Sequence, residues 1–211
     1  MVESGLVRPS PSVAGRQCRA FSGHPVRRLS PAAHHEAMPA FRRPSRPSHP
    51  VRVEPGPGQE SVWDYPRPPR VEPRTERVVV RLGGVVVADT TAAIRVLETS
   101  HPPVYYLPRS DFTAGALSRA EGRSLCEFKG QAGYLDVTGG GVVARRAGWT
   151  YAAPWPGYES LVNHVAIYPG AMDSCEIDGE VVQAQEGDFY GGWTTANLVG
   201  PFKGAPGTMG W

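Results

Sequence analysis

The sequence predicts an all-β or β-rich α+β fold, with one compact, antiparallel, sandwich- or barrel-like domain over residues 61–211. Three observations lead to this prediction. Short runs rich in β-branched and aromatic residues follow one another closely after residue 70. Glycine-rich turns separate these runs, as in β-sandwiches and barrels. No helical segments of ordinary length alternate with the runs, so a parallel α/β sheet is not expected.

Three glycine-containing turns each lie between two strand-like runs, which is the sequence pattern of a β-hairpin. The turns are Gly83-Gly84, Gly139-Gly140-Gly141 and Asp178-Gly179. The runs that they join are residues 77–82 with 85–88, 125–137 with 141–152, and 174–177 with 180–183. We further expect strands within 90–98, 104–107 and 165–168, a helical turn or loop at 110–120, and a short helix at 158–162.

Residues 1–60 differ from the remainder in composition. They hold ten of the 22 prolines, four of the six histidines, and nine arginines against four acidic residues. Without apolar periodicity, such a segment cannot bury enough surface to offset the entropy of ordering. We therefore predict a disordered, basic extension. Met38 is a candidate start codon. A nucleic-acid partner is not expected, because no aromatic residues that could stack on bases interleave with the arginines.

The sequence suggests a cytoplasmic protein without a membrane or metal partner. Residues 1–60 contain no apolar stretch like that of a secretory signal peptide. No run approaches the roughly 18 apolar residues of a membrane helix. The three cysteines (Cys18, Cys126 and Cys175) show no metal-ligand spacing, nor do His101 and His164. No metal or other cofactor is predicted, and the oligomeric state is left open.

The run from Glu98 to Tyr106 is the best candidate for a functional site. It gathers an acid, two hydroxyls, an imidazole and two phenols around the rigid pair Pro102-Pro103. We predict that His101 acts as a general acid or base and that Glu98 orients it. The alternative is that both side chains only satisfy backbone groups at the end of a strand.

Further side chains are candidates for binding a ligand. Lys129 lies in the run 126–130, which we expect to be a strand with Cys126 on the core face; the lysine would then hold an anion or form an ordinary cross-strand ion pair. Aromatic residues would either line the pocket or fill the core. Those chosen as ligand-binding are Trp63, Tyr105, Tyr106 and Tyr190.

Several segments together resemble domain-of-unknown-function family 427, which also carries a nucleotidyltransferase label. They are SVWDYPRPP (61–69), VADT (87–90), LETSHPPVYY (97–106), CEFKG (126–130), AGWTY (147–151), VAIYP (165–169) and YGGW (190–193). The family often has Trp where this chain has Phe128. The resemblance implies a compact, mostly β domain and assigns no activity.

Three functional hypotheses follow. The first is a domain that binds an unknown small molecule. One version of this hypothesis is an enzyme that uses a His/Glu/Tyr pocket. The second is a non-catalytic interaction module with an exposed aromatic patch. The third is a nucleotidyltransferase, which would need carboxylates clustered around Mg²⁺. Only Asp64, Glu98 and Asp136 are candidates for such a cluster, and the sequence has no phosphate-binding glycine motif.

Overall fold

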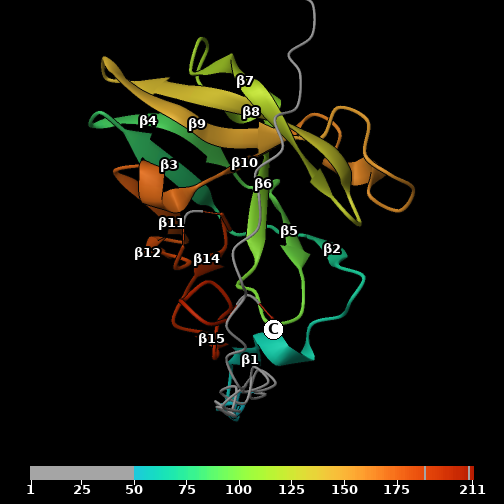
Figure 1. Ribbon diagram of the computed structural model, residues 1–211. Coiled ribbons are helices and arrows are strands. Elements are labelled where there is room, and N and C mark those ends of the chain that lie inside the picture. The colour runs from blue at the N-terminus through green and yellow to red at the C-terminus, as the bar shows by residue number, and fades with distance from the viewer. Residues whose placement is uncertain (1–49, 188, 209) are drawn as a thin grey trace, which may run out of the picture. The chain divides into compact units, whose positions relative to one another are not determined.

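Two antiparallel sheets form the frame of the protein (Figure 1). The computed structural model describes residues 50–187, 189–208 and 210–211. The predictions for residues 1–49, including the candidate start at Met38, lie outside this described part. Residues 50–59 have no regular secondary structure, and the first strand begins at Glu60.

The larger sheet has seven strands, and every neighbouring pair is antiparallel. In spatial order they are β2 (Arg70–Pro73), β5 (Ile94–Leu97), β6 (Val104–Pro108), β10 (His164–Ile167), β9 (Val142–Thr150), β8 (Gly130–Gly139) and β7 (Leu117–Cys126). The smaller sheet has the order β12 (Glu180–Val181), β11 (Ser174–Ile177), β3 (Val78–Leu82) and β4 (Val85–Thr90).

Two further strand pairs join segments that are distant in the sequence. β13 (Gln183–Ala184) pairs with β14 (Trp193–Thr194), and β1 (Glu60–Ser61) pairs in parallel with β15 (Leu198–Val199). Short 3₁₀ turns are Val62–Asp64, Arg109–Asp111, Glu159–Leu161 and Pro169–Ala171. The described residues contain no α-helix, so the all-β prediction is confirmed, and no helix among them could cross a membrane.

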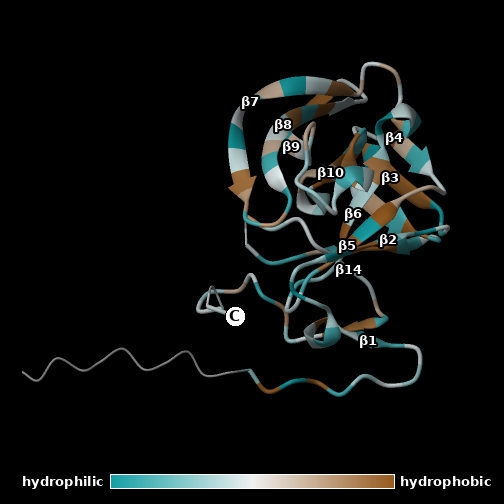
Figure 2. Ribbon diagram, turned by 90° about the vertical axis from the view of Figure 1, so that its right-hand side faces the viewer, coloured by the Kyte–Doolittle hydropathy of each residue, from teal (hydrophilic) through white to brown (hydrophobic). Residues whose placement is uncertain are grey.

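The main core lies between the two sheets. Val78, Val80 and Val87 of the smaller sheet pack with Leu107 and Ile167 of the larger one. Because successive side chains of a strand point to opposite faces, the larger sheet has a second buried face. Figure 2 shows hydrophobic residues concentrated in β3 and β5, and polar residues along the curved β7.

We call this second face the aromatic face. Its buried aromatic members are Tyr106, Trp149, Tyr151 and Tyr158. Ile94, Val96 and Ala166 complete the layer, and Tyr168 packs against it. Several side chains of the aromatic face, among them Tyr106 and Trp149, line a cavity that is described below.

All three predicted hairpins are present. The turns at Gly83-Gly84 and Gly140-Gly141 belong to the β3–β4 and β8–β9 hairpins, and their tips touch. Gly140 has φ 52°, and a Cβ there would overlap the carbonyl oxygen of Gly83. Glycine is therefore required by both the conformation and the close approach of the tips.

Two local predictions were wrong. Strand β7 begins at Leu117, within the segment expected to be a helical turn or loop. The prediction missed this strand because most of its residues are polar and are half-buried or exposed on both faces. The segment from Cys126 to Gly130 is not a continuous strand, since residues 127–129 form the β7–β8 turn. Lys129 therefore lies at a hairpin tip, and Cys126 packs against the aromatic face, not in the main core.

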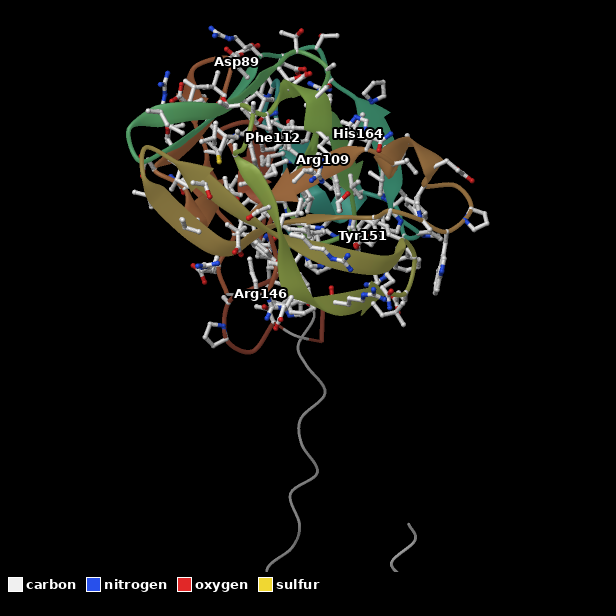
Figure 3. The ribbon with its side chains drawn as sticks, turned by 90° about the horizontal axis from the view of Figure 1, so that it is seen from above. Asp89, Arg109, Phe112, Arg146, Tyr151 and His164 are labelled. Carbon is white, nitrogen blue, oxygen red and sulfur yellow. The ribbon has the colours of Figure 1, made fainter. Side chains whose placement is uncertain are left out.

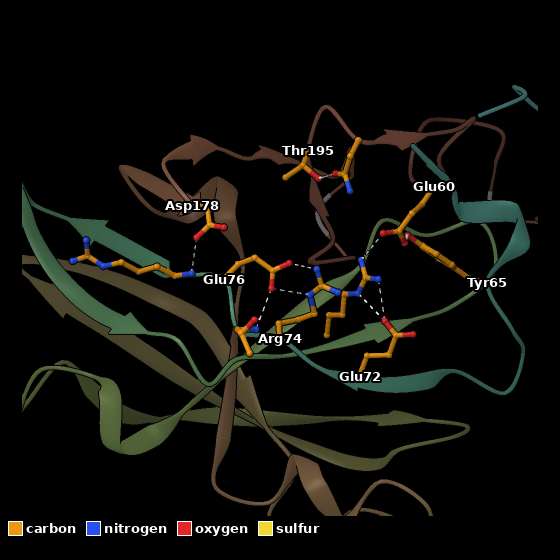
Figure 4. Close-up of polar contacts among 11 residues, drawn as sticks. Glu60, Tyr65, Glu72, Arg74, Glu76, Asp178 and Thr195 are labelled. Carbon is orange, nitrogen blue, oxygen red and sulfur yellow. Dashed lines mark hydrogen bonds and ion pairs between the residues drawn. The ribbon is translucent and has the colours of Figure 1, made fainter. Parts of the chain in front are cut away.

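A buried arginine joins β1 to the larger sheet. The Arg95 guanidinium, which is 8 % exposed, pairs with Glu60 at 3.1 Å and with Glu72 at 2.9 Å (Figure 4). The hydroxyl of Tyr65 donates a 2.9 Å hydrogen bond to the same Glu60. Beside this network, Val62, Tyr65, Leu97 and Leu198 form a small apolar cluster that packs the β1–β15 pair against the sheet.

Candidate functional site

A cavity of about 390 Å³ opens over the aromatic face. Its floor comes from β5, β6 and β9, and one wall is the β7–β8 turn. Further lining comes from the C-terminal part of the chain, which also holds β14: Gln185, Phe189, Tyr190, Gly191 and Lys203. The cavity thus combines three regions that are far apart in the sequence.

One end of the cavity is aromatic. The indole Nε1 of Trp149 donates a 3.2 Å hydrogen bond to the hydroxyl of Tyr106, and the Tyr168 ring lies 4.5 Å from that of Trp149. Burial raises the pKa of both Tyr106 and Tyr151, so the two phenols remain neutral. Figure 3 marks Tyr151, which follows directly after the end of β9. This end suits an apolar or planar group.

A glycine lets the C-terminal lining of the cavity approach the indole. A Cβ at Gly191 would overlap the Trp149 ring, and one at Gly192 would overlap the side chain of Gln185. Glycine at these two positions therefore lets the backbone pass close to the side chains of Trp149 and Gln185.

The other end of the cavity is charged. Glu98 Oε2 lies 3.9 Å from Lys129 Nζ, and Glu98 Oε1 lies 3.6 Å from Arg67 Nη2. Arg67 makes a closer contact, 2.9 Å, with Glu127. Lys203 also lines the cavity, and its ammonium donates a 2.8 Å hydrogen bond to the carbonyl oxygen of Trp211.

His101 is held in one tautomer by Gln185. The Gln185 Oε1 accepts a hydrogen bond from the Gly192 N–H, so its Nε2 is the donor that meets Lys203 O at 2.6 Å and His101 Nδ1 at 3.1 Å. His101 Nδ1 is therefore an acceptor, and the proton of the neutral ring resides on Nε2. Burial, and then the neighbouring cations led by Lys203, lower the pKa of His101 to about 3.

Five of the seven predicted site residues line this cavity: Glu98, His101, Tyr106, Lys129 and Tyr190. Tyr105 does not, because it precedes Tyr106 in β6 and so points to the other face, where it stacks on Trp193 at 5.2 Å. Trp63 lies outside as well. Its Nε1 donates a hydrogen bond to Pro201 O, and its ring packs against Trp211.

The expected contact between Glu98 and the His101 ring is absent from the described structure. The two residues are joined only through the backbone, where the His101 N–H donates to Glu98 O at 3.0 Å. Glu98 instead faces the cations Arg67 and Lys129, because a buried carboxylate is stabilised by opposite charge. The role of proton carrier predicted for His101 remains a prediction, and the fixed neutral ring favours a hydrogen-bond donor instead.

The sequence reasoning missed several lining residues. Trp149 and Tyr151 are two positions apart and so share a face at the end of β9, a signal that strand periodicity could have given. Gln185 and Lys203 carried no such signal, because they lie outside any long strand. His164 does not belong to the cavity, and its Nδ1 lies 3.0 Å from Val162 O.

The three acids considered for a metal cluster have separate partners. Asp64 pairs with Arg52, Asp136 pairs with Arg145, and Glu98 faces the pocket cations. Within residues 50–187, 189–208 and 210–211, no group of three or more His, Cys, Asp or Glu side chains is placed to hold a metal ion.

The fold and the cavity together define an all-β protein with a pocket that is aromatic at one end and charged at the other. The family model NTP_transf_9, described as a domain of unknown function (DUF427), matches residues 70–178. The chain belongs to this family. No curated protein matches the sequence. Within the matched range lie Glu98, His101, Lys129 and Trp149, whereas Gln185 and Lys203 lie beyond it.

The lowered pKa of His101 predicts that the stability of the fold depends on pH. The unfolded chain protonates this imidazole near its ordinary pKa of about 6.5, whereas the folded chain does not until about pH 3. Stability should therefore fall as the pH drops from 6.5 towards 3, by about 1 kcal/mol per pH unit. Urea unfolding at pH 7 and pH 5 should show a clearly smaller loss for His101→Asn than for the wild type. Equal losses would contradict the buried neutral ring.

Proposed function

We propose that this protein binds a small organic molecule in the cavity over the aromatic face. The cavity carries the proposal because it joins an apolar floor to convergent charged side chains, which is the usual composition of ligand sites. At about 390 Å³ its volume is also in the range of such sites.

A fluorescent probe tests the proposal. 1-Anilinonaphthalene-8-sulfonate has aromatic rings and one negative charge, and its fluorescence rises in apolar sites. We expect one molecule to bind per chain. Val104 lines the cavity and is half-buried, so Val104→Trp should fill part of the cavity and weaken binding at least tenfold. Val86, which is also half-buried but lies in β4, gives the control Val86→Trp.

An interaction module remains the second candidate, because two apolar side chains at the rim are largely exposed. Leu125 is 69 % and Phe189 is 68 % exposed, and both line the cavity. A flat partner surface would use these side chains and leave the interior empty. If Val104→Trp bound the probe as well as the wild type and Leu125→Ser did not, the second function would replace the first.

A further inference from the structure

Two opposite charges in the cavity are close together without a hydrogen bond between them. Lys129 Nζ and Glu98 Oε2 are 3.9 Å apart, and the two side chains are only 10 % and 20 % exposed. Other partly buried pairs of the protein are closer, such as Arg95 with Glu72 at 2.9 Å. The ammonium and the carboxylate therefore both retain hydrogen-bonding capacity directed at the cavity.

Neither group has a hydrogen bond among the described residues. Arg67 Nη2 lies 3.6 Å from Glu98 Oε1, too far for a hydrogen bond, and is hydrogen-bonded to Glu127, whereas Lys203 is hydrogen-bonded to a main-chain carbonyl. Lys129 and Glu98 both line the cavity, so a bound ligand can form charge-assisted hydrogen bonds with both.

A third group of the cavity is a fixed donor. Since Gln185 donates to Nδ1 of His101, the free Nε2–H of the neutral ring can donate to an acceptor of the ligand. The charged end thus offers the Lys129 ammonium and the His101 N–H as donors beside the Glu98 carboxylate. A ligand that pairs with all three groups carries an anionic acceptor and a cationic donor.

The aromatic end of the cavity determines what kind of side chain the ligand can carry. The rings of Tyr106, Trp149 and Tyr168 form an apolar floor, and the indole N–H of Trp149 is already hydrogen-bonded to the Tyr106 hydroxyl. A large apolar or aromatic side chain can pack there without leaving the indole N–H unpaired.

We propose that the ligand is a free α-amino acid with a large apolar side chain, an inference that rests on the proposed binding function. Its carboxylate would meet Lys129 and His101, its ammonium would meet Glu98, and its side chain would lie on the aromatic floor. A simple anion would leave the Glu98 carboxylate without a partner on the ligand, and a simple cation would leave Lys129 without one. A zwitterion neutralises both groups and forms charge-assisted hydrogen bonds with both.

The test compares three probes that share an indole ring. L-Tryptophan has both charges, indole-3-propionate lacks the ammonium, and tryptamine lacks the carboxylate. Calorimetric titration of the full chain should show that L-tryptophan binds at least tenfold more tightly than either analogue.

Two variants test which side chain of the protein binds the ammonium of the ligand and which binds its carboxylate. In Glu98→Gln the advantage of L-tryptophan over indole-3-propionate should shrink to threefold or less, because the partner of the ammonium is gone. In Lys129→Met the advantage of L-tryptophan over tryptamine should likewise shrink to threefold or less, because the partner of the carboxylate is gone. Glu176→Gln is the matched control, since Glu176 pairs with Arg81 in the smaller sheet. It should leave all three affinities unchanged.

The outcomes separate this inference from the proposed function. If 1-anilinonaphthalene-8-sulfonate binds in the cavity but L-tryptophan binds no better than its analogues, the ligand class is wrong and the binding function stands. If Glu98→Gln leaves the advantage over indole-3-propionate intact, the assignment of the charges is overturned. If Val104→Trp does not weaken binding of the fluorescent probe, the proposed function itself fails.

Discussion

Trp193→Ala should lower the free energy of unfolding by about 3–5 kcal/mol. Trp193 is fully buried in the main core and stacks on Tyr105. Its indole Nε1 donates a 3.0 Å hydrogen bond to Ile167 O, and its backbone N–H donates to Pro103 O at 2.8 Å. The substitution leaves a cavity and an unpaired buried carbonyl, and both effects add to the loss of apolar burial.

Urea denaturation followed by circular dichroism measures this loss. Trp155→Ala is the matched control, because Trp155 is 45 % exposed and should contribute much less to stability. Since Trp193 also fixes the start of β14, ligand binding in Trp193→Ala should be lost at a lower denaturant concentration than in the wild type. Equal effects of the two substitutions would show that the segment around Trp193 is not anchored in the core.

Arg95→Met should destabilise the protein by about 3–5 kcal/mol near pH 7. The substitution removes the only cation that contacts both Glu60 and Glu72 within the described chain. Glu60 then keeps only its hydrogen bond from Tyr65 and Glu72 only its pair with Arg70, and the loss of the buried cation between them accounts for most of the cost. The control Arg77→Met breaks an exposed pair with Asp89, which should cost at most about 1 kcal/mol.

The effect of Arg95→Met should diminish in acid. Burial alone would raise the pKa of Glu72, but its hydrogen bonds and charge interactions with Arg95, and then with Arg70, outweigh this and hold the pKa below its usual range. A carboxylate of this kind stabilises the fold above its ordinary pKa of about 4.3, and the contribution is lost as the pH falls through the lowered value. The wild type and the variant should therefore differ less at pH 2.5 than at pH 7. A constant difference would mean that Arg95 acts through packing alone.

The hairpins were predictable because their signals are local. Gly83-Gly84 and Asp178-Gly179 adopt positive φ at their turns, a preference that the residue types themselves reveal. Strand β7 was not predictable, since an outer strand with polar residues on both faces has no alternation to detect. The same periodicity also separates Tyr105 from Tyr106, because their side chains point to opposite faces of β6 and only that of Tyr106 lies on the aromatic face.

The charged end of the site was only partly predictable. Glu98 and His101 stand beside a rigid diproline, which made them visible in the sequence. Their partners depend on long-range packing: Arg67 approaches from one segment, and Gln185 from another over 80 residues away. The sequence around Glu98 and His101 does not show which distant side chains these two residues will contact. The tautomer of His101 therefore followed only from the structure.

The parallel pairing of β1 with β15 has a kinetic consequence. Glu60 lies opposite Leu198, and the pocket is walled by residues from Arg67 to Lys203. Contacts between such distant positions form slowly, because a long loop must close before any energy is gained. The local hairpins should therefore assemble early, and the binding site should be among the last parts to mature. Recovery of ligand binding after dilution from denaturant should accordingly lag behind recovery of β-structure.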